Sequence, residues 1–282
     1  MPKTTKDKFV IQGKAYEKPI LCDLTKPFQH HDKNLIIFCH GYKGFKDWGC
    51  WNLMADKFAQ NGISFLKFNF SHNGGTINNP IDFPDLKAFS ENNYSIEVND
   101  VIRVVSYVKS EFTYFANAKI HLMGHSRGGG IACIASSRDL NIESLILLAS
   151  VSDYKNRFPE QSEIDKWKEN GVRYIENKRT KQQLPHLYQF YQNYMDNESD
   201  LNIESKVSRT EDLHTDASNI ISLLTEIKRT TDSLKSIKLR SKKLRREVIQ
   251  VDSLNNHEAP SIESPSEPEE QASTQEQNSV KQ

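Results

Sequence analysis

Short apolar runs alternate with amphipathic stretches over the first half of the chain. The apolar runs are rich in β-branched and aromatic residues, which predicts buried strands at 9–12, 20–24, 35–39, 63–70, 119–123 and 144–149. Between them, residues 51–60, 95–110 and 129–137 have helical spacing. This alternation predicts an α/β fold with a mostly parallel sheet that helices cover on both faces. The first two strands are close enough in sequence to form an antiparallel hairpin that leads into the sheet.

The pattern then becomes polar, and we divide the chain into a core at 1–152 and a helical cap at 153–204. The cap carries many aromatic residues: Trp167, Tyr174, Tyr188, Phe190, Tyr191 and Tyr194. Two interpretations remain for them, packing of the cap onto the sheet and lining of a pocket.

The last part of the chain differs in kind. Apolar residues recur in a 3-4 alternation from Ile220 to Val251, which predicts one long helix over 205–252. Such a helix pairs with another one, so residues 213–252 are a candidate surface for a homo-oligomer or a partner helix. Residues 253–282 are rich in Pro, Ser, Glu and Gln, and we expect them to be disordered.

Composition narrows the classes of partner. Lys plus Arg and Asp plus Glu both number 37, so the net charge of zero gives no whole-protein argument for nucleic acid or an anionic membrane. No apolar run has the length of a signal peptide core or a membrane span, which favours a cytoplasmic location. The four cysteines form no CxxC pair, and Cys39 and Cys133 stand in apolar runs typical of buried, reduced thiols. No zinc-type ligand spacing occurs, so we expect no metal and no cofactor.

The strongest chemical signal is Gly124-His-Ser126-Arg-Gly128, which follows a predicted strand and precedes a predicted helix. A nucleophile placed between a strand and a helix needs a sharp turn, and the glycines on either side make that turn possible. The turn presents the Ser126 hydroxyl above the sheet edge. The backbone N–H of Arg127 is then a candidate donor to an oxyanion.

A second signal lies upstream, where the run at 35–39 ends in His40-Gly41-Tyr42. The backbone N–H of the residue after this His-Gly pair, here Tyr42, is a candidate for the other oxyanion donor. His40-Gly41 alone would be an ordinary strand end. Paired with the turn at Ser126, it favours catalysis.

Together these segments resemble the bacterial α/β-hydrolase superfamily, near its dienelactone-hydrolase-like and serine-aminopeptidase-like groups. The resemblance covers about residues 9–203 and rests on the stretches 40–49, 68–74, 124–130 and 177–183. It implies hydrolysis of a small-molecule carboxylic ester, thioester or amide through an acyl-serine intermediate, without a cofactor.

The resemblance also shows what is missing. In the family, two further strands follow the cap and carry the aspartate and the histidine that activate the serine, and no such segment is readable after residue 205. Asp153 is a candidate acid, although a loop aspartate that caps the next helix fits its position better. His186, His214 and His257 are the candidate bases, whereas His72 and His125 belong to the motifs themselves and are expected to orient loops or pack.

Three hypotheses follow. The chain is a serine hydrolase whose last part, or a partner, completes the site. Alternatively it is an inactive protein derived from a hydrolase, which acts by association through its long helix. The third possibility is a fused or frame-shifted gene that has lost its normal C-terminus.

Overall fold

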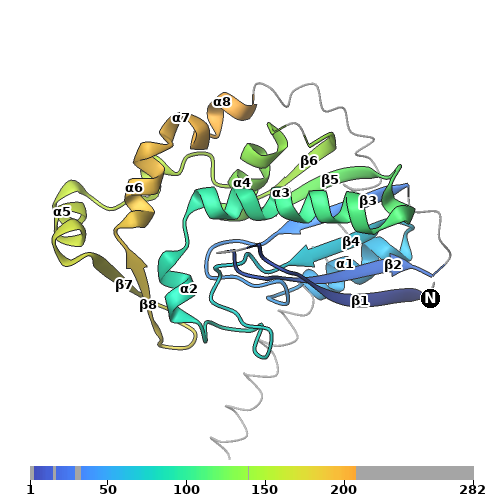
Figure 1. Ribbon diagram of the computed structural model, residues 1–282, viewed down its shortest axis with the longest axis horizontal. Coiled ribbons are helices and arrows are strands. Elements are labelled where there is room, and N and C mark those ends of the chain that lie inside the picture. Colours follow the sequence, from blue (N-terminus) through green and yellow to red (C-terminus); the bar gives the residue numbers. More distant parts are fainter. Residues whose placement is uncertain (1–2, 15–16, 29–32, 139, 208–282) are drawn as a thin grey trace, which may run out of the picture. The chain divides into compact units, whose positions relative to one another are not determined.

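The computed structural model describes residues 3–14, 17–28, 33–138 and 140–207 (Figure 1). One sheet is built from β1 (Thr4–Ile11), β2 (Ile20–Pro27), β3 (Asn34–Cys39), β4 (Ser64–Phe68), β5 (Lys119–His125) and β6 (Ile142–Leu148). The longer helices around it are α1 (Trp51–Gln60), α3 (Tyr94–Glu111) and α4 (Arg127–Ser136). The strands and helices predicted for the core are therefore confirmed, with ends that differ by a few residues.

The strand order is β1-β2-β4-β3-β5-β6. β1 pairs antiparallel with β2, and β2 pairs antiparallel with β4, whereas β4, β3, β5 and β6 run parallel. The predicted mostly parallel sheet and the antiparallel hairpin at its start are both confirmed. Because the parallel strands end at the same edge, the loops after β3 and β5 are brought together there.

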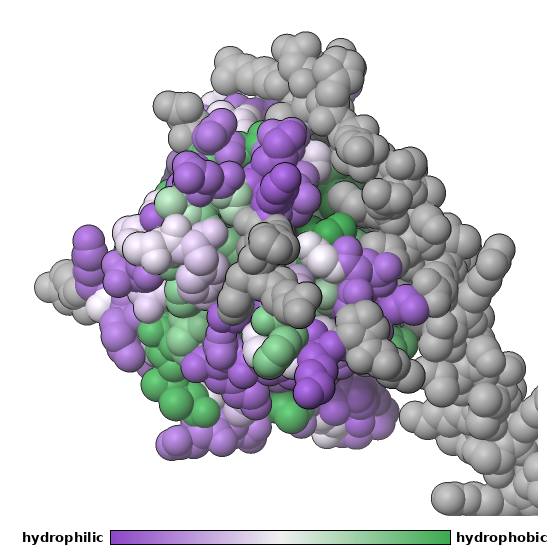
Figure 2. All heavy atoms as spheres, turned by 90° about the vertical axis from the view of Figure 1, so that its right-hand side faces the viewer, coloured by the Kyte–Doolittle hydropathy of each residue, from purple (hydrophilic) through white to green (hydrophobic). Residues whose placement is uncertain are grey.

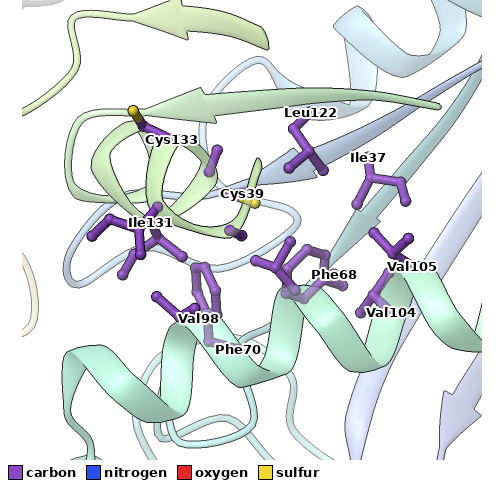
Figure 3. Close-up of a cluster of buried hydrophobic side chains, with 14 of the residues drawn as sticks. Ile37, Cys39, Phe68, Phe70, Val98, Val104, Val105, Leu122, Ile131 and Cys133 are labelled. Carbon is purple, nitrogen blue, oxygen red and sulfur yellow. The ribbon is translucent and has the colours of Figure 1, made fainter. Parts of the chain in front are cut away.

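Two hydrophobic clusters lie on opposite faces of the sheet, because successive side chains along a strand point to opposite faces. On one face Ile37, Cys39 and Leu122 pack against α3 and α4, as Figure 3 shows for Val98 and Ile131 among others. On the other face the neighbours in sequence, including Ile36, Phe38 and Met123, pack against Trp51, Met54 and Phe58 of α1. The continuous apolar runs thus supply the hydrophobic core on both faces of the sheet.

The cap differs from its prediction. Besides α5 (Gln161–Asn170), α6 (Gln189–Asp196) and α7 (Glu198–Leu201), it contains an antiparallel hairpin of β7 (Val172–Glu176) and β8 (Gln183–Leu187). The three helices agree with the predicted helical cap, whereas the hairpin between α5 and α6 was not predicted. The hairpin turns through residues 177–182, where Lys181 adopts a positive φ of 62°. A short helix, α2 (Leu86–Glu91), lies against β8 and was also not predicted (Figure 1).

The predicted long helix, the pairing surface at 213–252 and the disordered tail lie outside the described residues, apart from α8 (Glu204–Val207) at the beginning of that segment. Within the described part of the chain, the sheet ends at β6, which pairs with β5 alone. The side chain of Leu147 on this strand is 43% exposed.

The described helices include none with the length and apolar character needed to cross a membrane. Figure 2 shows the side of the molecule that lies to the right in Figure 1, where the described surface is mostly hydrophilic with separate small hydrophobic areas. All four cysteines are free, and Cys39 and Cys133 are buried as predicted.

Candidate active site

Ser126 stands at the predicted sharp turn between β5 and α4. Its backbone has φ 54° and ψ −120°, a conformation that side-chain-bearing residues rarely adopt. Holding it costs roughly 1–3 kcal/mol, which the surrounding structure must offset. The Ser126 N–H donates to the carbonyl oxygen of Leu148 at 3.0 Å, and its own carbonyl oxygen accepts from the N–H groups of Gly129 and Val151, both at 3.0 Å. β6 and the loop after it therefore fix the turn.

The glycines around Ser126 are required by close approach of the backbone. A Cβ atom on Gly124 would lie 2.3 Å from the carbonyl oxygen of Gly128. A Cβ atom on Gly128 would lie 2.4 Å from the carbonyl oxygens of Cys39 and His40. The start of α4 is thus pressed against the end of β3, as the sequence motif implied.

The loop after β3 passes directly over the turn. A Cβ atom on Gly41 would lie 3.2 Å from the Ser126 Cβ and 3.1 Å from Nδ1 of His125. The next residue is Tyr42, so the two backbone segments that carry the predicted oxyanion donors adjoin the serine. The structure brings together all three residues predicted from sequence, since Tyr42, Ser126 and Arg127 line one cavity of about 320 Å³.

Most of that cavity is made by the cap. Its aromatic lining consists of Tyr42, Tyr94, Tyr154, Phe158, Trp167 and Phe190. Of the cap aromatics, Trp167 and Phe190 line the cavity and also belong to the main hydrophobic cluster, so both interpretations hold for them. Tyr174, in contrast, is 60% exposed and does neither.

Arg127 has a buried side chain with an unusual environment. Its guanidinium carbon lies 5.2 Å, 4.6 Å and 4.9 Å from the ring centroids of Tyr42, Tyr94 and Phe190. Its Nε lies 3.1 Å from Oε2 of Glu97 on α3. Burial opposes the charge, but Glu97 and the tyrosines raise the pKa of Arg127 above its usual value. Burial raises the pKa of Glu97 against the opposing effect of Arg127.

His186 on β8 and Tyr42 form a second polar pair in the lining of the cavity. Nε2 of His186 lies 2.6 Å from the hydroxyl of Tyr42. Burial, followed by the charges of Arg127, Arg173 and Lys43, lowers the pKa of His186 to about 3. Burial raises the pKa of Tyr42 to about 12. At neutral pH this is therefore a hydrogen bond between two uncharged side chains.

Within the described residues the Ser126 hydroxyl makes no hydrogen bond, so none of the candidate bases in this part of the chain is paired with it. His72 is held by the hydroxyl of Ser71 at 2.8 Å, and the ring of His125 packs against Trp51. His214 and His257 lie outside the described residues. The expected roles of His72 and His125 in loop orientation and packing fit these contacts.

Asp153 caps a short helical turn. Its Oδ1 accepts from the N–H of Lys155 at 2.7 Å, and its Oδ2 accepts from the side-chain amide of Asn156 at 2.6 Å. This is the capping role that its position in the sequence favoured. As placed, both carboxylate oxygens are engaged locally, so Asp153 is a poor partner for a catalytic histidine.

Sequence reasoning missed Arg157 and Arg173, which complete the cavity lining, and Tyr94 and Glu97, which surround Arg127. No local pattern could have identified them, because they come from the cap and from the start of α3. The aromatic content of the cap was the one signal that pointed to a pocket in that region.

Comparison of the sequence with known protein families shows which family this chain belongs to. A model described as "alpha/beta hydrolase fold" matches residues 34–247, more than half of the chain. The match continues past residue 203, beyond the stretch that carries the resemblance in the sequence, so part of the last segment, including His214, lies within the matched range. No protein sequence with a curated description matches this chain.

One solved structure shows the same fold at low identity, and others match more weakly. A protein of Agrobacterium vitis S4 named as a hydrolase has a TM-score of 0.52 at 19% identity, covering 69% of this chain and 72% of its own. Mouse alpha/beta hydrolase domain-containing protein 10 has a TM-score of 0.49 at 15% identity, with coverages of 67% and 70%. A cold-adapted esterase from an Arctic intertidal metagenomic library has a TM-score of 0.42 at 14% identity, with coverages of 51% and 60%. The Agrobacterium vitis structure supports the fold, and its low identity supports nothing finer.

Proposed function

Because this chain belongs to the α/β-hydrolase fold family, we propose that it is a serine hydrolase that cleaves a carboxylic ester, thioester or amide through an acyl-Ser126 intermediate. The observation that carries the proposal is the strained backbone of Ser126 at the N-terminus of α4, beside a cavity lined by Tyr42 and Arg127. Strained backbone conformations of this kind cluster at active sites.

In the proposed reaction the Ser126 oxygen attacks the carbonyl carbon, and its proton passes to a base. The carbonyl oxygen becomes negatively charged and accepts from the backbone N–H groups of Tyr42 and Arg127. The alcohol, thiol or amine then leaves with a proton, and water hydrolyses the acyl-enzyme by the same steps in reverse order. His214 is the candidate base, because it lies in the matched range and the described histidines are engaged elsewhere.

A fluorophosphonate probe tests the proposal, since it reacts with activated serines. We expect covalent labelling of the full-length protein at one site, lost in Ser126→Ala and retained in Ser150→Ala. Ser150 is a matched control because its hydroxyl lies close to the same turn, donating to the Val151 carbonyl oxygen at 3.0 Å. His214→Ala should slow labelling by at least about 100-fold if that histidine is the base.

Failure to label the folded protein would leave the second hypothesis, an inactive protein that acts by association through 213–252. The absence of a described partner for the Ser126 hydroxyl is the observation that keeps this alternative in view. Sedimentation of the full chain and of a chain ending at residue 207 would then show whether the last segment mediates self-association.

A further inference from the structure

The cavity beside Ser126 is cationic as well as aromatic. Three arginines line it, Arg127, Arg157 and Arg173, and its described lining includes no aspartate or glutamate. A cavity with fixed positive charge and low-dielectric walls attracts anions, because the field is concentrated where water is excluded. The positive charge of these arginines therefore favours the entry of anionic substrates.

These arginines are only partly neutralised from outside the cavity. Arg173 donates to Glu163 at 3.2 Å, but that carboxylate is 57% exposed and the pair is screened by solvent. No ion pair of Arg157 is formed with the described residues. Arg127 is paired with Glu97 through its Nε, whereas its Nη2 is buried and makes no hydrogen bond with the described residues.

The unused Nη2 donor of Arg127 is the most informative observation. The residue is 7% exposed and its guanidinium is held between three aromatic rings, so it cannot turn toward water to satisfy this donor. Buried donors without acceptors are costly, and a carboxylate is the acceptor that best matches a guanidinium. A second unused group, Nδ1 of His186, is also buried at the cavity wall.

From these observations we propose that the cavity selects esters, thioesters or amides that carry a carboxylate on an aromatic or apolar body. The carboxylate would lie among Arg127, Arg157 and Arg173, and the apolar body against Trp167 and Phe190. This inference rests on the proposed hydrolase function for its reaction, but its binding site can be tested without turnover.

Binding of 3-phenylpropanoate and of its neutral analogue 3-phenylpropanamide to the Ser126→Ala protein, measured by calorimetry, is the direct test. We expect the carboxylate to bind at least about tenfold more tightly, corresponding to one charge-assisted hydrogen-bonded pair. The double variant Arg157→Met/Arg173→Met, made in the same background, should reduce this preference, because Arg127 alone would then face the carboxylate. Both arginines are outside the buried core, so the variant should fold, which circular dichroism would confirm.

Arg179→Met is the matched control. Arg179 is an exposed arginine at the turn of the β7–β8 hairpin that pairs with Asp82 and does not line the cavity, so its loss should leave the preference unchanged. Equal binding of the acid and the amide, or a preference that the double variant leaves unchanged, would overturn the inference.

Kinetics separate this inference from the proposed function. If 4-nitrophenyl hexanoate and the mono-4-nitrophenyl ester of adipic acid are both hydrolysed with equal kcat/KM, the hydrolase stands and the anion preference fails. If the carboxylate binds as expected but neither ester is cleaved and Ser126 is not labelled, the anion site stands and the proposed reaction fails.

Discussion

The hydroxyl of Tyr42 lies 2.6 Å from Nε2 of His186, joining the loop after β3 to the cap strand β8. These residues are far apart in the sequence, so the hydrogen bond ties the cap to the core at the cavity itself. Substituting Tyr42→Phe would leave the backbone N–H in place and remove only the hydroxyl. We expect a loss of about 1–2 kcal/mol in the free energy of unfolding, because Nε2 of His186 is left without a partner.

Urea unfolding measures this change, and labelling of Ser126 by the fluorophosphonate probe should persist because the proposed oxyanion donor is the backbone. Tyr174→Phe is the control, since that hydroxyl belongs to an exposed side chain on the neighbouring strand β7. An unchanged urea midpoint for Tyr42→Phe would mean that the hydrogen bond does not hold the cap.

The second prediction concerns pH. Burial lowers the pKa of His186 to about 3, whereas the same side chain in the unfolded chain keeps a value near 6.5. Between these values the unfolded chain binds a proton that the folded protein does not. The free energy of unfolding should therefore fall as the pH falls below 6.5, by about 1.4 kcal/mol per pH unit from this residue.

Other groups contribute to the same profile, so the variant His186→Gln is needed. Burial lowers the pKa of His40 to about 4, which acts in the same direction, whereas burial raises the pKa of Asp100 to about 7, which acts in the opposite one. The difference between the wild-type and His186→Gln profiles isolates one residue. Urea unfolding at pH 7.5, 6.0 and 5.0 should show a shallower acid loss in the variant; parallel profiles would contradict the neutral state of His186.

A third prediction tests the packing of the turn. Gly128→Ala would place a Cβ atom 2.4 Å from two carbonyl oxygens, and both belong to the backbone of β3 and its following loop, which cannot yield easily. We expect a loss of at least about 3 kcal/mol in the free energy of unfolding, together with loss of Ser126 labelling.

Gly49→Ala is the matched control for that experiment. Gly49 has a positive φ of 66° but no atom within 4 Å of an added Cβ, so only backbone strain acts there. A loss of roughly 1 kcal/mol with labelling retained is expected. A loss at Gly128 no larger than that at Gly49 would mean that the backbone around Gly128 yields to the added Cβ atom and that the contact with β3 does not decide the effect.

The core could be predicted from sequence because its signals are local. Each strand is a short apolar run, and the turn at Ser126 is marked by glycines that the backbone contacts require. The cap hairpin was missed because β8 contains Pro185 and polar residues, and because β7 is short. A strand that pairs mainly with its hairpin partner needs little apolar pattern, so the sequence carried little signal for it.

The environment of Arg127 could not be predicted for a different reason. Sequence reasoning chose this residue for its backbone N–H, whereas the structure surrounds its side chain with Tyr42, Tyr94 and Phe190, from the loop after β3, from α3 and from α6. Contacts between elements so far apart depend on how the cap folds over the sheet. No periodicity or motif reports that arrangement.

A last prediction concerns a buried ionic network away from the cavity. Lys67 is almost completely buried on β4, and its Nζ lies 2.8 Å from Oδ2 of Asp23 and contacts Asp47 as well. Lys46 contacts the same two carboxylates, so two lysines and two aspartates neutralise one another. Lys67→Met should lower the free energy of unfolding by roughly 3 kcal/mol, because two carboxylates would then share one cation in a partly buried site.

The exposed pair of Lys119 and Glu143 supplies the comparison. Their side chains are 59% and 38% exposed, and Lys119→Met should cost less than about 1 kcal/mol because solvent screens the pair. Urea unfolding of both variants at neutral pH measures the two losses on the same scale. Equal losses would mean that burial does not increase the contribution of Lys67 to the free energy of unfolding. The pairs with Asp23 and Asp47 would then be screened by solvent like the exposed pair.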